Sequence, residues 1–254
     1  MKQNGWVEAL ASMDGDVTWK SCLIGLSEAS YSFVTRALVD ALPTNSNLAI
    51  WKKVISSQCG SCDSKKQTLL HVLNHCSNKL QAFTWRHNNI LFKLKEFISS
   101  KLPDQEILCD LVVKDKCFVD ANVHTVPFDI LSTNLRPDLC IIDRANQKIT
   151  IVELTVPYTS NISSAQERKS LKYRPLVAGL EEMGFETTFY TIELCSRGIA
   201  AQGTSRILKS LCHSSRSETR ELVKSLSRLV IKCSYIIFRE KDNRDAIFKT
   251  VILS

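Results

Sequence analysis

The sequence contains no uninterrupted apolar run of the roughly 18 residues that a membrane-spanning helix needs. Its best candidate, around residues 229–238, is broken by Lys232. The first residues, Met1–Trp6, also lack the basic region and the apolar run of a secretory signal peptide. Internal repeats and low-complexity tracts are absent as well. We therefore expect a soluble, intracellular protein that is neither secreted nor inserted in a membrane.

A disulfide framework is not expected either, although the chain has 10 cysteines, because disulfides persist mainly in proteins of the secretory route. Most of these cysteines stand singly among apolar neighbours, where cysteine behaves as a small hydrophobic residue. Only Cys59, Cys62 and Cys76 are clustered. The close spacing of these three cysteines is not explained by a role as small hydrophobic residues.

The composition is that of an ordinary globular protein, with 44% hydrophobic and 23% charged residues. The 33 basic residues outnumber the 26 acidic ones, which gives a formal charge of +7. An excess of this size suits a polyanionic partner such as nucleic acid, but net charge alone does not identify one.

Apolar periodicity predicts helices over residues 84–102, 163–183, 204–212 and 218–238, and a short one over 48–55. Runs rich in β-branched residues predict strands over 107–113, 139–142, 149–156 and 187–195, with a hairpin loop at 143–148. This order predicts an α/β (α+β) fold in which helices flank a small mixed sheet. We divide the chain into a helical linker (1–50), a metal-binding module (51–83), a main domain (84–215) and a C-terminal helix (216–254).

Residues 59–76 carry a zinc-binding pattern. Cys59 and Cys62 form a Cys-x2-Cys turn, and His71 and Cys76 follow after eight and four more residues. Four nitrogen and sulfur ligands define a structural zinc site with no open position. His75 is a rival for the fourth place, and we prefer Cys76 because thiolates dominate such sites.

Two acidic residues lie on neighbouring predicted strands. Asp138 begins one strand and Glu153 lies within the next, so a hairpin would bring both carboxylates to one end of the sheet. One or two carboxylates, completed by water and phosphate, are what Mg²⁺ prefers. Lys169 and Lys172 lie on one face of the following helix, where a lysine can orient an attacking water and stabilise charge on a phosphate.

These motifs together resemble the restriction-enzyme-like endonuclease at the C-terminus of site-specific non-LTR retrotransposon proteins, a branch of the P-D…(D/E)-x-K nuclease superfamily. The resemblance runs from about residue 35 to about residue 215. Ala41–Leu48 resembles the segment between polymerase and zinc knuckle, and Cys59–Cys76 resembles the Cys-Cys-His-Cys knuckle itself. Trp85–Ile90 resembles the family's Arg-His-(Asp/Asn) helix, and Cys195–Gly198 resembles a short turn. The nuclease motif is matched by Arg136–Asp138, Glu153 and Lys169–Tyr173.

The resemblance implies a restriction-endonuclease-like fold after a zinc knuckle, with Asp138 and Glu153 binding Mg²⁺ and Lys172, or alternatively Lys169, as the catalytic lysine. The superfamily pattern places that lysine two residues after the second acid, but Thr155 stands there. The lysine has then moved to the following helix. Phosphates of the DNA would be held by basic side chains outside the acidic pair, namely Arg86, His87, Arg136, Lys52 and Lys53.

The implied function is metal-dependent nicking of DNA, which in intact relatives primes reverse transcription. The polymerase is absent from this sequence, so we expect DNA, the RNA of the element, or a reverse transcriptase acting in trans as partners. A DNA substrate favours the nucleus over the cytoplasm. The alternative is a zinc-containing nucleic-acid-binding remnant that has lost its chemistry.

Overall fold

The computed structural model describes residues 13–15, 19–62, 65–114, 117–119, 125–246 and 248. Its central element is a four-stranded mixed sheet in the order β1-β4-β5-β6. The strands are β1 (Glu106–Cys109), β4 (Leu139–Asp143), β5 (Lys148–Thr155) and β6 (Glu186–Glu193). β1 and β5 both pair antiparallel with β4, and β6 pairs parallel with β5. The predicted mixed sheet flanked by helices is confirmed.

The hairpin between β4 and β5 forms where the turn-like residues predicted it. Leu139 lies opposite Val152 and Asp143 opposite Lys148. The predicted first strand, in contrast, is wrong in its extent. It breaks at Asp110, whose backbone N–H donates to the carbonyl oxygen of Asp138 at 3.1 Å. The chain then enters a separate hairpin of β2 (Val112–Lys114) and β3 (Cys117–Val119).

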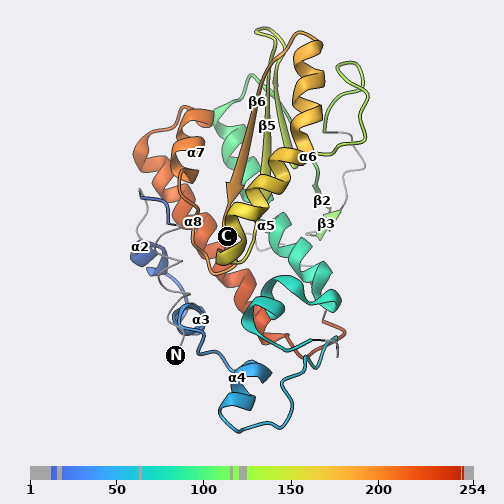
Figure 1. Ribbon diagram of the computed structural model, residues 1–254. Helices are drawn as coiled ribbons and strands as arrows, with labels where there is room; N and C mark the ends of the chain where they lie inside the picture. Colours follow the sequence, from blue (N-terminus) through green and yellow to red (C-terminus); the bar gives the residue numbers. More distant parts are fainter. Residues whose placement is uncertain are drawn as a thin grey trace.

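The two faces of the sheet pack against different helices (Figure 1). On one face α6 (Ile162–Glu182) places Tyr173, Leu176 and Leu180 against alternate residues of β4 and β5. On the other face lie α5 (Leu80–Lys101), α7 (Thr204–Cys212) and α8 (Arg216–Arg239). This separation follows from the period of two along a strand, which sends neighbouring side chains to opposite faces.

The largest of the three apolar clusters among the described residues extends through all four predicted segments of the chain. It joins residues as distant in the sequence as Phe33, Leu73 and Phe238. The N-terminal part contains α2 (Trp19–Leu23), α3 (Glu28–Leu38) and α4 (Asn45–Ile50), and of these α2 and α3 contribute to this cluster. Part of the predicted linker, residues 1–12 and 16–18, lies outside the described residues.

The short helix predicted over 48–55 is shifted toward the N-terminus. Thr44 caps α4 by accepting a hydrogen bond from the Asn47 N–H at 3.3 Å, so the helix begins at Asn45. The helix ends at Ile50, and Lys52 then adopts a positive φ of 58°.

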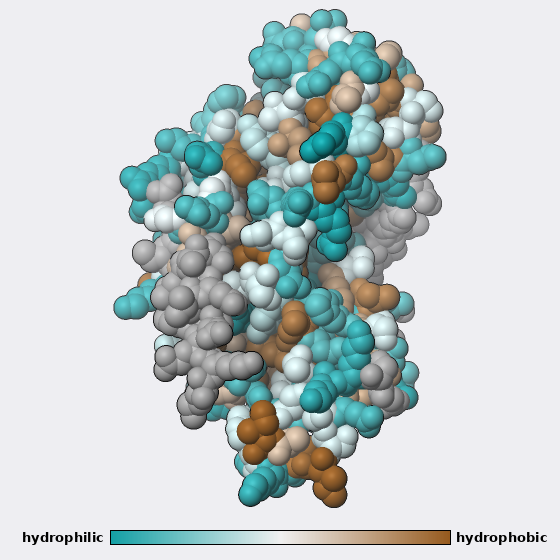
Figure 2. All heavy atoms as spheres, in the orientation of Figure 1, coloured by the Kyte–Doolittle hydropathy of each residue, from teal (hydrophilic) through white to brown (hydrophobic). Residues whose placement is uncertain are grey.

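The surface is mainly hydrophilic on the face shown in Figure 2, but apolar side chains gather at its lower end, where α4 lies in Figure 1. The exposed apolar side chains in this segment are Ile50, Trp51, Val54 and Ile55. Among the described helices, none is long and apolar enough to cross a bilayer.

Candidate metal centre and acidic site

The predicted zinc ligands come together where the loop after α4 meets η1, a π-helical turn at His71–His75. One ligand atom from each of Cys59, Cys62, His71 and Cys76 lies within 4.8 Å of the other three. Cys62 Sγ lies 3.3 Å from His71 Nε2, and Cys59 Sγ lies 4.0 Å from Cys76 Sγ. Ligands at about 2.0–2.3 Å from one zinc ion stand about 3.5 Å apart, so this donor set can hold zinc.

The rival ligand, His75, is exposed and stands outside this cluster, whereas Cys76 is buried within it. The chain conformation explains the choice, because Cys76 follows the last residue of η1 with an extended ψ of 117°. This turn of the backbone brings its thiol back toward the metal centre.

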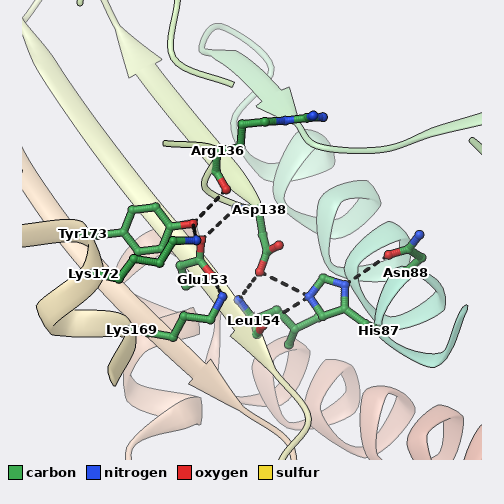
Figure 3. A network of polar contacts seen from close by, with 9 residues as sticks. All are labelled: His87, Asn88, Arg136, Asp138, Glu153, Leu154, Lys169, Lys172 and Tyr173. Carbon is green, nitrogen blue, oxygen red and sulfur yellow. Dashed lines mark hydrogen bonds and ion pairs between the residues drawn. The ribbon is translucent and has the colours of Figure 1, made fainter. Parts of the chain in front are cut away.

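The acidic site lies at the end of β4 and β5, as predicted for Asp138 and Glu153 (Figure 3). Asp138 precedes Leu139, the first residue of β4, and the register places it beside Glu153. The Asp138 N–H donates to Glu153 Oε1 at 3.3 Å, and the Leu154 N–H donates to Asp138 Oδ2 at 2.8 Å. These backbone contacts fix both carboxylates at one point of the sheet.

Lys169 and Lys172 approach this site in different ways. The Lys169 ammonium lies 2.6 Å from Glu153 Oε2, and the Glu153 side chain is only 1% exposed. Lys172 instead donates to the Tyr173 hydroxyl at 2.9 Å, and that hydroxyl donates to the Arg136 carbonyl oxygen at 2.8 Å. Of the two lysines, only Lys169 forms an ion pair with an acid of the site.

His87 is part of this acidic network, although the sequence suggested a phosphate contact. Its Nε2 lies 3.2 Å from Asp138 Oδ2 and 3.2 Å from the Leu154 carbonyl oxygen, and its Nδ1 lies 3.1 Å from Asn88 Oδ1. Both ring nitrogens therefore face acceptors, an arrangement that suits the doubly protonated imidazolium.

The electrostatics agree with this arrangement. Burial alone would lower the pKa of His87, but the Asp138 carboxylate and the hydrogen bonds of the ring outweigh it and raise the pKa to about 9. Burial works to raise the pKa of Asp138, yet His87 and Lys169 hold it below its ordinary value. Burial and the neighbouring Asp138 raise the pKa of Glu153 against the opposing effect of Lys169. A bound cation would relieve the proximity of the two acids.

One carboxylate oxygen of the acidic pair is available to bind a cation. Asp138 Oδ2 is engaged by His87 and Leu154, while Asp138 Oδ1 accepts no hydrogen bond from the described residues. A carboxylate oxygen that accepts no hydrogen bond and lies next to a second carboxylate fits the ligand set that Mg²⁺ prefers.

The other predicted phosphate contacts lie apart from this site or are already engaged. Arg86 is 1% exposed, and its guanidinium donates to Ser234 Oγ and to the Leu73 carbonyl oxygen, both at 3.0 Å. This burial corrects the prediction, because a side chain in the core cannot contact a phosphate on the surface. Arg136 pairs with Asp110. Lys52 and Lys53 are exposed after α4, which lies below the sheet at the lower end of the molecule in Figure 1.

Two buried polar residues on this side of the sheet had no role assigned from the sequence, namely Tyr173 and Glu193. Tyr173 links Lys172 to the chain just before Asp138. Glu193 lies opposite Thr155, is 4% exposed and has its pKa raised by burial. The signal was available for Glu193, because it interrupts an apolar strand between Ile192 and Leu194 as Glu153 does in its own strand.

Comparison with known proteins adds no identification: no family model matches the chain, and no curated protein matches it significantly.

Proposed function

We propose that the protein is a metal-dependent endonuclease that nicks DNA, with a restriction-endonuclease-like active site and a structural zinc knuckle. The observation that supports this most directly is the acidic site itself. Asp138 and Glu153 lie side by side at one end of the sheet, and Lys169 contacts Glu153 at 2.6 Å. Two acids and one lysine in this order are the components that the nuclease motif requires.

In this proposal Asp138 and Glu153 would hold Mg²⁺, which when bound would lower the pKa of a water and neutralise charge on the scissile phosphate. Lys169 is the residue placed to orient the attacking water and to stabilise negative charge on the phosphate. His87 is a positioning residue, because it holds Asp138 Oδ2 and leaves Oδ1 for the proposed metal ion (Figure 3). A DNA substrate would place this activity in the nucleus.

The test is nicking of supercoiled plasmid by the purified chain with Mg²⁺. Asp138→Asn and Glu153→Gln should lower the nicking rate on the order of 100-fold or more, the loss seen when a group that stabilises transition-state charge is removed. Asp143→Asn is the matched control, because it changes a partly exposed acid of the same hairpin at the other end of β4. It should nick at the parental rate.

The same assay separates the two lysines. Lys169→Met should lose nicking as the acid variants do, while Lys172→Met should retain most of it, because only Lys169 contacts an acid. DNA affinity should persist in all of these variants. Equal nicking by the parent and Asp138→Asn would overturn the proposal. A parent that binds DNA but does not nick it would support the inactive binding remnant instead.

A further inference from the structure

A hollow of about 260 Å³ opens between the zinc knuckle and the sheet, next to the acidic site. The knuckle contributes Asn74 and His75, β5 contributes its last residue Thr155, and the start of α6 contributes Asn161, Ser164 and Arg168. The hollow therefore lies where the metal-binding module, the central strand and the helix that carries Lys169 meet.

The lining has the chemistry of an anion site. It includes the cationic Arg168 and several hydrogen-bonding side chains, but no Asp or Glu. Glu193 pairs with Thr155 in the sheet, yet it does not line the hollow. The N-terminus of α6 has neither a capping side chain nor an acidic residue in its first turn, so its positive end is not neutralised there.

A second, independent observation is the side chain of Thr155. It is 8% exposed, and its Oγ1 has no hydrogen-bond partner among the described residues. Buried hydroxyls are normally partnered, and this one belongs to a residue that lines the hollow. Asn74 Oδ1 is likewise buried without a partner. A ligand with acceptor oxygens, such as a phosphate, would accept a hydrogen bond from the Thr155 hydroxyl.

The spacing between Thr155 and Glu153 along β5 indicates which phosphate of a bound strand Thr155 would contact. Thr155 follows Glu153 by two residues on β5, so both side chains lie on the same face of the sheet, about 6.6 Å apart along the strand. This is similar to the separation of neighbouring phosphates along one nucleic-acid strand.

We propose that this hollow binds the backbone phosphate adjacent to the scissile phosphate of the same strand, through Arg168, Thr155 and the start of α6. This inference depends on the proposed nuclease function for the identity of the scissile phosphate. It makes the knuckle part of the substrate surface, because Asn74 and His75 form one wall of the hollow.

The test measures binding of a fluorescently labelled DNA duplex by anisotropy, with zinc present and Mg²⁺ omitted so that no cleavage occurs. Arg168→Ala should weaken binding about tenfold, the effect of one charge-assisted hydrogen bond. It should also reduce the salt slope by about 0.9. Arg174→Ala removes the same charge from an exposed position of the same helix and should change affinity less than about twofold.

Thr155→Val provides the second variant, because it removes the hydroxyl and keeps the shape. It should weaken DNA binding several-fold without lowering the melting temperature, since the hydroxyl has no partner within the described protein. A structural role for this hydroxyl would instead lower the melting temperature. Equal effects of Arg168→Ala and Arg174→Ala, or unchanged affinity in Thr155→Val, would overturn the proposal.

The binding assay also keeps the two proposals apart. If nicking fails but Arg168→Ala selectively loses affinity, the hollow remains a phosphate site in a binding protein. If nicking succeeds, a duplex with one neutral methylphosphonate next to the mapped nick should bind the parent about tenfold more weakly but bind Arg168→Ala unchanged. A parent insensitive to this substitution would reject the adjacent phosphate as the ligand.

Discussion

His87 and Arg86 are neighbours in the sequence, but α5 directs them to different tasks. Successive helical residues are about 100° apart around the axis, so Arg86 enters the core while His87 reaches the end of the sheet. Of the predicted Arg-His pair, Arg86 therefore stabilises the fold, and His87 holds Asp138 in the acidic site. The same rotation explains why adjacent basic residues cannot be assigned one role from the sequence.

The His87–Asp138 pair predicts a specific dependence of stability on pH. The pKa of His87 is about 9 in the folded protein, compared with an ordinary value of 6.5. A raised histidine pKa stabilises the fold fully below pH 6.5, and this contribution is lost as the pH rises through 9. The loss should be on the order of 3 kcal/mol for a shift of this size.

The measurement is the unfolding free energy between pH 6 and 10, with zinc present and Mg²⁺ omitted. His87→Gln should remove the decline in stability above pH 6.5. Asp138→Asn should remove it as well, and the double variant should match the single ones, because the two side chains act as one pair. A parental decline that persists in His87→Gln would assign the pH dependence to another group.

At the scale of elements, α8 begins with a complete capping box. Ser215 Oγ accepts from the Glu218 N–H at 3.2 Å, and the Glu218 carboxylate accepts from the Ser215 N–H at 2.9 Å. Glu218 also pairs with Lys101 at the end of α5. The first turn of α8 is thus fixed to the end of the helix it packs against.

Ser215→Ala should lower the unfolding free energy by about 1 kcal/mol, the ordinary contribution of an N-cap. Ser225→Ala makes the same chemical change within the body of α8, where alanine is the better helix former. It should leave stability unchanged or slightly raised in denaturant titrations. A loss of similar size in both variants would show that the box contributes nothing beyond the side chain removed.

Several elements could be predicted from the sequence because their signals are local. The β4–β5 hairpin has β-branched strands and a turn between them, and the zinc cluster has a characteristic spacing. The contacts of Arg86 with Ser234 and of Lys169 with Glu153 could not be predicted in the same way. They depend on how separate helices pack, and hydrophobic periodicity gives the buried face of a helix but not its partner.

The break after β1 has the same origin. Ile107–Val113 reads as one strand by composition, but Asp110 is engaged with the backbone of Asp138 and the side chain of Arg136. Both partners lie more than twenty residues away in the sequence. A tertiary contact therefore overrides a local strand preference here.

At the scale of the whole molecule, the module that carries the candidate zinc ligands is fixed to the end of α8. Gln67 donates to Asp242 at 2.7 Å, and the buried Lys79 ammonium donates to the Glu240 carbonyl oxygen at 2.8 Å. Asn74 donates to the Val156 carbonyl oxygen just after β5, also at 2.8 Å. The metal centre is thereby connected to both the helical layer and the sheet.

Loss of zinc should therefore destabilise the whole fold and not the knuckle alone. His71→Gln should lose bound zinc and lower the melting temperature by about 10 °C, the shift expected for a loss of roughly 4 kcal/mol in a chain of this size. His75→Gln is the matched control and should keep the metal, because His75 stands outside the cluster. Metal content by elemental analysis and calorimetry would check both. Zinc loss in His75→Gln would contradict the ligand set.

The hydrogen bonds of the Arg86 guanidinium limit where this chain could be cut into independently folding parts. It bonds at once to the knuckle at Leu73, to α8 at Ser234 and, at 3.5 Å, to the chain after β5 at Val156. A gene fragment that encoded only the sheet would leave a buried cation without its acceptors. Recombination could exchange this region as one block, but could not separate it between residues 83 and 84, the boundary that the sequence suggested.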